Sequence, residues 1–286
     1  MKRKTSLVIG GDRRMVILAD MLSETFESYV YCNTSAIPRT SKKINALSEI
    51  IKTDIVVLPI PSFDKNGILN GTENLSAEAL FSSLPCSSII FGAKLSELHR
   101  HIAKEYGHKL FDYGENERFN MYNAIPTAEG AILIAMENSE STVHNSHYVV
   151  IGYGRIGKIL SKNLKSLGGC VTVVSRNEKS LALAECEGFN TVSMKDFCQS
   201  PITCDICFNT VPTVVLNEEQ IKYWSCSMYI ELASSPGGLS KDAKKSLNER
   251  YISALSLPGK YFPQTSGMII YKTITDMIDS IGGYNK

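Results

Sequence analysis

Residues 148–157 read YVVIGYGRIG, an apolar run that leads into three glycines spaced G-x-G-x-x-G. The run predicts a buried strand, and the sequence after Gly157 predicts a helix. In this motif Gly152 permits a tight turn, Gly154 lets the backbone approach a pyrophosphate, and Gly157 allows close packing of helix on strand. The helix N-terminus offers amides to phosphate. The stretch predicts a Rossmann domain that binds a dinucleotide; the alternative is a glycine-rich turn without a ligand.

The next predicted strand, residues 170–174, ends in Ser175-Arg176-Asn177, and Lys179 follows shortly. An NAD-selective site places Asp or Glu here, whereas Arg and Ser accept a 2′-phosphate. The sequence therefore favours NADP(H) as cofactor; the alternative is that Arg176 only points into solvent. The predicted cofactor-binding residues, which include loops after later strands, are Gly152, Tyr153, Gly154, Arg155, Ile156, Gly157, Ser175, Arg176, Asn177, Lys179, Thr210, Val211, Pro212 and Ala233.

Strand and helix patterns alternate along the whole chain, over residues 1 to about 120 and again after residue 146. Such alternation predicts parallel sheets with helices on both faces. We expect an α/β protein with two doubly wound, Rossmann-like domains and an interdomain cleft. The expected divisions are an N-terminal substrate or partner domain (1–123), a bridging helix (124–145), an NADP-binding Rossmann domain (146–260) and a C-terminal helix that packs back toward the N-terminal domain (261–286).

Two helices are expected from local signals. The bridging helix should begin at Ala124 with Pro126 in its first turn, where a missing N–H is tolerated. A second helix should lie near residues 44–51, where apolar side chains recur.

Composition points to a small-molecule protein. The 286 residues include 30 Lys and Arg against 29 Asp and Glu, a net charge of +1. No strong field therefore attracts nucleic acid or an anionic membrane. No apolar stretch approaches a membrane span or a signal peptide. Eight cysteines in a chain of this length suggest reduced thiols, so we expect a cytoplasmic protein.

Two motifs with metal or redox spacing are expected to be structural. Cys204-Asp-Ile-Cys207 continues into a pattern typical of a buried strand, not of a helix N-terminus that would stabilise a thiolate. The pair His99 and His101 lies in a predicted helix, and we interpret it as part of a solvated face and not as a pair of metal ligands. No metal site is predicted.

Rossmann architecture alone does not name a reaction. A short-chain dehydrogenase needs a Tyr-x-x-x-Lys pair, and none of the thirteen tyrosines has Lys four places on. A 2-hydroxyacid dehydrogenase fits the two-domain layout but needs an acid/base His after the later Rossmann strands. All five His precede the glycine loop. A non-catalytic NADP-binding sensor and an NAD(P)-dependent dehydrogenase of another small carboxylic acid stay open.

Five strings beyond simple patterning carry a resemblance. They are GGDRR at 10–14, NAIPTAEGA at 123–131, GYGRIG at 152–157, ELASSPGG at 231–238 and LPGKYFPQTSG at 257–267. Together they resemble the A-subunit family of bacterial dipicolinate synthase over nearly the whole chain. One departure is Phe262, where that family usually has Ala before the Pro of the last string.

The resemblance implies an oxidoreductase of spore formation in the mother-cell cytoplasm. With a smaller, flavoprotein-like B subunit, it would convert a dihydrodipicolinate-level intermediate, a small dicarboxylate, into dipicolinate. Transfer of hydride from a dihydropyridine ring to NADP⁺ leaves an aromatic ring, which fits the predicted cofactor. An oligomer is expected, and neither nucleic acid nor membrane is an expected partner.

The first glycine-containing loop is expected to bind the substrate. It follows the opening strand, so backbone amides, Arg13 and Arg14 should lie at the carboxyl edge of the first sheet, and the planar guanidinium suits a carboxylate. The alternative is that an arginine pairs with Asp12. Glu129 is the candidate proton acceptor, unless it caps the helix or faces solvent. The full substrate set is Gly11, Asp12, Arg13, Arg14, Asn123, Thr127 and Lys260.

Overall fold

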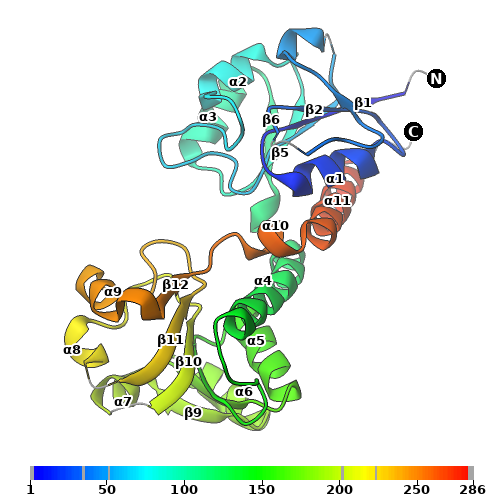
Figure 1. The fold of residues 1–286 in the computed structure, drawn as a ribbon. Coiled ribbons are helices and arrows are strands. Elements are labelled where there is room, and N and C mark those ends of the chain that lie inside the picture. Colours follow the sequence, from blue (N-terminus) through cyan, green and yellow to red (C-terminus); the bar gives the residue numbers. More distant parts are fainter. Residues whose placement is uncertain (1–2, 34–35, 51, 201–202, 223, 283–286) are drawn as a thin grey trace. The chain divides into compact units, whose positions relative to one another are not determined.

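A computed structural model describes residues 3–33, 36–50, 52–200, 203–222 and 224–282. The last four residues of the predicted C-terminal segment lie outside this described part. The chain divides into two compact units (Figure 1). Unit 1 comprises Met1–Asn123 and Pro258–Lys286, and unit 2 comprises Ala124–Leu257.

Unit 1 contains a parallel six-stranded sheet. The strands are β1 (Thr5–Ile9), β2 (Glu27–Tyr31), β3 (Lys42–Lys43), β4 (Ile55–Val57), β5 (Ile89–Gly92) and β6 (Lys109–Asp112), in the order β3-β2-β1-β4-β5-β6. Central positions of β1 and β4 are fully buried and apolar, as expected for a sheet covered on both faces.

Helices cover both faces of this sheet (Figure 1). On one face, α1 (Arg13–Leu22) and α11 (Pro263–Ser280) share a core that includes Met15, Leu18 and Ile274. On the other face, α2 (Ala77–Ser83) and α3 (Glu97–Glu105) contribute Leu80, Phe81 and Ala103 to a second core. The C-terminal helix thus completes the core of the N-terminal unit.

Unit 2 repeats the arrangement. Its strands are β7 (His147–Ile151), β8 (Cys170–Ser175), β9 (Asn190–Ser193), β10 (Thr203–Asn209), β11 (Ser225–Glu231) and β12 (Tyr251–Ser253), in the order β12-β11-β10-β7-β8-β9. Its helices are α5 (Arg155–Ser166), α6 (Glu178–Cys186), α7 (Met194–Gln199), α8 (Glu218–Ile221) and α9 (Lys241–Leu247). In Figure 1, α5 and α6 lie on one face of the sheet, while α7, α8 and α9 lie on the other.

Both sheets have the doubly wound Rossmann strand order, so the predicted fold class is confirmed. In each sheet the order reverses beside the first strand, between β1 and β4 in unit 1 and between β7 and β10 in unit 2. Open α/β sheets bind ligands outside the carboxyl ends of the strands at this reversal. Each unit therefore presents one edge at which a ligand is expected.

Two local helix predictions were wrong. Helix α4 spans Glu117–Glu137, so Pro126 lies well inside it. The helix begins earlier because Asn116 accepts a hydrogen bond from the Phe119 amide and so caps its first turn. Residue 51 of the second prediction lies outside the described residues, and residues 44–50 contain only a short 3₁₀ turn, Leu47–Glu49. The apolar side chains of Ile44, Leu47 and Ile50 pack on the core of unit 1 without a continuous helix.

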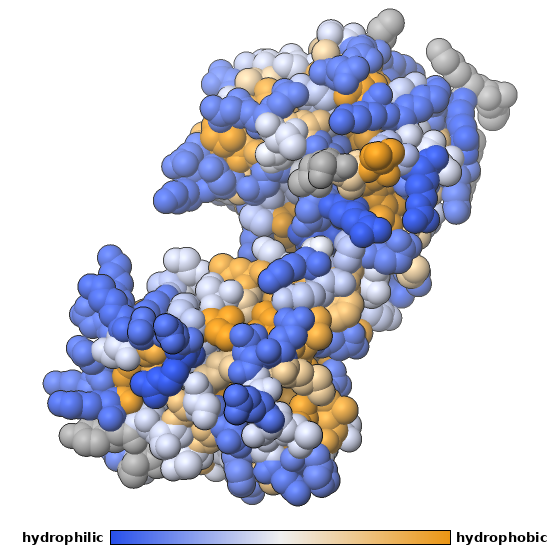
Figure 2. Space-filling model, in the orientation of Figure 1, coloured by the Kyte–Doolittle hydropathy of each residue, from blue (hydrophilic) through white to orange (hydrophobic). Residues whose placement is uncertain are grey.

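Within the part of the chain that the structure describes, no helix is long and apolar enough to cross a membrane. The face drawn in Figure 2 carries mainly hydrophilic side chains with smaller hydrophobic areas between them.

Candidate nucleotide and substrate sites

The structure requires glycine at two of the three glycine positions in the loop after β7, and for different reasons. Gly152 has φ +95°, a conformation that L side chains rarely adopt, and a Cβ there would collide with Thr210. A Cβ on Gly157 would collide with the carbonyl oxygen of Gly152. Gly154 has an ordinary φ of −85°, and a Cβ there would meet nothing within 4 Å. Packing therefore requires two of the glycines, while the third leaves open space for a ligand.

Helix α5 begins directly after Gly154, which is its N-cap residue and supplies no side-chain hydrogen bond. The first amides of a helix lack acceptors within the helix and carry the positive end of its dipole. An anion such as a pyrophosphate fits this position. The geometry therefore suits the role predicted from the motif.

Tyr153 turns its side chain away from this role. It is buried, its hydroxyl donates a hydrogen bond to Glu187 at 2.7 Å, and its ring packs edge-on against Phe189 at 6.0 Å between centroids. Of the predicted cofactor-binding residues, Tyr153 can therefore reach a nucleotide only through its backbone.

At the end of β8, Ser175 and Asn177 form local hydrogen bonds, whereas the Arg176 side chain is exposed. The Ser175 hydroxyl accepts from the Asn177 amide at 3.1 Å. The Asn177 side chain caps α6 by accepting from the amides of Lys179 and Ser180. Arg176 is exposed and forms no hydrogen bond or ion pair with the described residues. Its guanidinium is thus available to a phosphate.

The loops after β10 and β11 are held by a group that sequence analysis missed. Glu231 is 2% exposed, and its carboxylate accepts hydrogen bonds from the Asn209 side chain at 2.6 Å and the amides of Ala233 (3.1 Å) and Gly238 (2.7 Å). Burial raises the pKa of the Glu231 carboxyl above its ordinary value, although the hydrogen bonds from Gly238, Asn209 and Ala233 oppose this shift. Predicted residue Thr210 donates to the Ile151 carbonyl at 2.9 Å.

In unit 1 the glycine loop is filled by the protein itself. The Gly10 amide donates to the Tyr31 carbonyl at 2.8 Å, and the Gly11 amide donates to the Asn70 carbonyl at 2.6 Å. A Cβ on Gly11 would lie 2.8 Å from Pro59. These amides are therefore already used, and the expected approach of a ligand to the glycine backbone is not supported.

The two predicted arginines do not act as a pair. Arg14 is buried and binds Asp12 by two parallel contacts, Nε to Oδ1 at 2.9 Å and a terminal nitrogen to Oδ2 at 2.8 Å. Asp12 also caps α1, and Gly259 packs against the ion pair with no room for a Cβ. Arg13 is exposed. It lines a cavity of about 710 Å³ along one face of α1, together with Arg39 and, from α11, Gln264.

The other predicted residues are divided between the units. Lys260 is exposed in unit 1, with its Nζ 4.8 Å from the centre of the Tyr261 ring. Asn123 ends the first segment of unit 1, while Thr127 and Glu129 belong to unit 2. Thr127 is buried, and Glu129 is exposed without a hydrogen bond or ion pair to the described residues.

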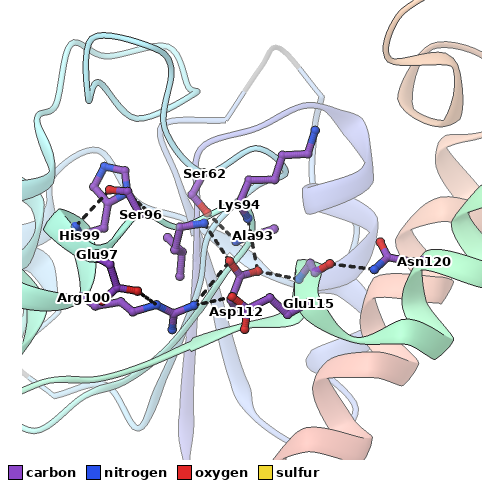
Figure 3. Close-up of polar contacts among 12 residues, drawn as sticks. Ser62, Ala93, Lys94, Ser96, Glu97, His99, Arg100, Asp112, Glu115 and Asn120 are labelled. Atoms are coloured by element: carbon purple, nitrogen blue, oxygen red, sulfur yellow. Dashed lines mark hydrogen bonds and ion pairs between the residues drawn. The ribbon is translucent and has the colours of Figure 1, made fainter. Parts of the chain in front are cut away.

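A polar network holds the carboxyl ends of β5 and β6 (Figure 3). The Asp112 carboxylate, 2% exposed, accepts from the amides of Lys94 at 3.2 Å and Leu95 at 2.8 Å. Arg100 forms an ion pair with Glu115 at 2.7 Å. Lys94 adopts φ 57° and keeps its side chain exposed. The sequence around Lys94 does not predict this exposed position at the end of β5, because the backbone of Lys94 is held by Asp112 at the end of the neighbouring strand β6.

The two motifs with metal or redox spacing lie on a strand and on a helix. Cys204 and Cys207 are buried in β10, and burial raises the pKa of the Cys207 thiol. His99 and His101 lie on α3, and the exposed His101 has its Nε2 3.3 Å from Oε1 of Glu105. Among the described residues, no group of three or more His, Cys, Asp and Glu side chains could hold a metal ion.

Each of the two units contains a segment that matches a known domain family. Residues 5–114 match the N-terminal domain of the A subunit of dipicolinate synthase, and residues 148–201 match the TrkA-N domain. The chain is 26% identical to the dipicolinate synthase A subunit of Bacillus subtilis (strain 168) in an alignment of 297 positions that covers 96% of this chain and 95% of the relative.

Three solved structures are similar to this chain over nearly its full length. The crystal structure of the dipicolinate synthase A chain from Bacillus subtilis has a TM-score of 0.82 and 25% identity, covering 98% of this chain and 97% of that chain. The structure of the corresponding protein from Bacillus halodurans has a TM-score of 0.82 at 23% identity, covering 96% and 97%. A transhydrogenase from Sinorhizobium meliloti, with a TM-score of 0.70 at 12% identity over 96% and 94%, shares the fold.

Unit 2 thus has the fold of a nicotinamide dinucleotide-binding domain. Over nearly its full length, the chain is similar in sequence and in structure to the A subunit of dipicolinate synthase.

Proposed function

We propose that this chain is the A subunit of a dipicolinate synthase that oxidises a dihydrodipicolinate-level intermediate to dipicolinate with NADP⁺. It would act in the cytoplasm of a sporulating cell together with a flavoprotein-like B subunit. The observation that carries the proposal is the similarity, over 96% of the chain, to the Bacillus subtilis A subunit. The open space at Gly154 supports it independently, because a nucleotide would need that space.

The residues present fit NADP(H). The glycine loop and the start of α5 would hold the pyrophosphate, and Arg176 would hold the 2′-phosphate. When bound, NADP⁺ supplies a hydride acceptor. The substrate gives up a hydride and a proton and becomes aromatic, so the protein mainly has to position it. Glu129 is our candidate for accepting that proton.

Arg176→Ala should weaken NADPH binding roughly tenfold to a hundredfold, since a hydrogen bond to a charged group contributes about 1.5–3 kcal/mol. NADH lacks the 2′-phosphate, so its binding should barely change. Titration of both cofactors by fluorescence measures the difference. Lys195→Ala, at another exposed cation of unit 2, is the matched control. Equal losses for both cofactors would contradict the assignment of NADP(H).

Arg13→Ala should weaken binding of dipicolinate roughly tenfold to a hundredfold, because Arg13 is an exposed cation beside a cavity and would lose a charge-assisted bond. NADPH affinity should stay constant. Calorimetry on the full chain measures both. Arg118→Ala is the control, since Arg118 is also exposed in unit 1 but pairs with Asp276 at 3.0 Å. Parent-like binding of dipicolinate by Arg13→Ala would remove Arg13 from the substrate site.

The proposed function is tested by supplying dihydrodipicolinate and NADP⁺ to the chain with and without its B subunit. We expect the ultraviolet absorbance of dipicolinate to appear only when both proteins are present. Full turnover by the single chain would refute the need for a partner. No product in either case would favour a sensor that binds NADP without catalysis.

A further inference from the structure

Two buried polar residues end neighbouring strands at the carboxyl edge of unit 2. Asn209 ends β10 and Glu231 ends β11, and the two residues face each other in the sheet register. Asn209 is 0% exposed and Glu231 is 2% exposed. The Asn209 side-chain nitrogen donates to Glu231 Oε1 at 2.6 Å. The pair is therefore a fixed unit inside the domain.

Each member of the pair holds the loop that follows its own strand. Glu231 Oε1 accepts from the Ala233 amide and Oε2 from the Gly238 amide, so one carboxylate ties both ends of the loop 233–238. A Cβ on Gly237 would lie 2.6 Å from Oε2, so the loop closes tightly over the carboxylate.

Asn209 acts in the same way on the preceding loop. Its side-chain oxygen accepts from the Val211 amide at 3.1 Å, and its nitrogen donates to the Val211 carbonyl at 2.9 Å. Thr210, next to it, is anchored to Ile151 at the end of β7. The loop 210–212 is thereby fixed against the strand that carries the glycine motif.

Fold stability alone gives little reason for this carboxylate. Its three hydrogen-bond donors are a neutral amide side chain and two backbone amides, and no Lys or Arg is among them. Removing a carboxylate from water is costly, and well-packed apolar residues often serve a fold as well or better. A buried carboxylate that organises two loops at a ligand-binding edge therefore points to a role in that site.

We propose that Glu231 and Asn209 are positioning residues that fix the loops 210–212 and 233–238 against the nicotinamide half of the bound dinucleotide. The inference rests on the proposed binding of NADP(H) by unit 2. In a Rossmann domain the dinucleotide lies across the strand reversal, with the adenosine half beside β8. The loops after β10 and β11 lie on the other side of the reversal, beside the nicotinamide half.

Glu231→Gln tests the proposal on the full chain. Glutamine keeps the shape but replaces one acceptor oxygen by an NH₂ donor. That donor must face either the Gly238 amide or the donors from Asn209 and Ala233, so one anchor is lost. We expect the Kd for NADP⁺ to rise about tenfold. Binding of adenosine 2′,5′-bisphosphate, which lacks the nicotinamide half, should change less than about twofold.

Asp205→Asn is the matched control. Asp205 also lies in β10 and accepts from a backbone amide, that of His147 at 2.7 Å, but at the amino end of the strand. The Asp205→Asn variant should bind NADP⁺ and adenosine 2′,5′-bisphosphate with the same Kd values as the unmodified chain. If Glu231→Gln does not fold, Asn209→Ser removes the other member of the pair. It should likewise raise the Kd for NADP⁺ more than the Kd for adenosine 2′,5′-bisphosphate.

Three results would overturn the proposal. Equal losses for both ligands would show that the pair supports the whole dinucleotide site and not the nicotinamide half, and parent-like binding of NADP⁺ would show that the anchors are not needed. If the unmodified chain binds neither ligand, the proposed function itself fails and the positioning role fails with it. Only the first two results leave the proposed function standing.

Discussion

Gly154→Asp is expected to abolish NADP⁺ binding and yet leave unit 2 as stable as before, or more stable. The backbone at Gly154 has φ −85° and ψ −158°. Asp12, the N-cap residue of α1 in unit 1, has nearly the same backbone, φ −100° and ψ −167°. An aspartate therefore fits this position without strain, and a Cβ there meets nothing within 4 Å.

Stability and binding should respond in opposite directions to this substitution. The new carboxylate can cap α5, which has no side-chain cap in the parent, and such caps contribute about 1 kcal/mol. The same carboxylate occupies the place of the pyrophosphate and repels its charge. We expect the Kd for NADP⁺ to rise by at least about a hundredfold, a change of ~2.7 kcal/mol.

Isothermal titration and thermal unfolding of the same preparation measure the two effects. Gly154→Ser is the control, because serine caps a helix without adding charge and should weaken binding less. Parent-like NADP⁺ binding by Gly154→Asp would show that the loop does not hold the dinucleotide. A large loss of stability would show that the glycine serves packing instead.

Gly157→Val, in contrast to Gly154→Asp, should lower the stability of unit 2. A Cβ at this position collides with the backbone carbonyl of Gly152, and backbone cannot give way as a flexible side chain can. Overpacking of this kind costs roughly 3 kcal/mol or more. We expect a clear fall in the unfolding temperature of unit 2.

The single tryptophan makes this measurable, because Trp224 lies in unit 2. It is 8% exposed and packs edge-on against Phe197, with ring centroids 4.9 Å apart. Its fluorescence therefore reports unfolding of that unit alone. Gly154→Ala is the control, since its Cβ meets no atom. An unchanged fluorescence transition for Gly157→Val would contradict the packing role of the glycine.

The glycine loop and the sheets could be predicted because their signals are local. Strand alternation and the spacing of Gly152, Gly154 and Gly157 follow from neighbouring residues. The similar-looking Gly10 and Gly11 could not be distinguished from a ligand-binding loop, because Asn70 and Pro59, which fill the space, are distant in sequence. The start of α4 was misplaced since Pro126 marks a first turn only when no earlier cap is present.

The site chemistry was less accessible to sequence analysis. Consecutive helix residues do not face the same way, so Arg13 and Arg14 could have been separated from the sequence alone, but the choice of Asp12 as partner for Arg14 required the structure. Glu231 begins the string 231–238 that carries the resemblance, but its role as an anchor could not be predicted, because its donors come from three separate positions that only the folded loops bring together.

The most direct test of the account is the fate of the hydride that leaves the substrate. Dihydrodipicolinate carrying deuterium on its tetrahedral ring carbons is given to the complex of this chain with its B subunit in the presence of NADP⁺. Mass spectrometry then follows the cofactor and the product. The account predicts singly deuterated NADPH, formed one for one with dipicolinate. Dipicolinate formed without deuterium in NADPH would contradict hydride transfer on this chain.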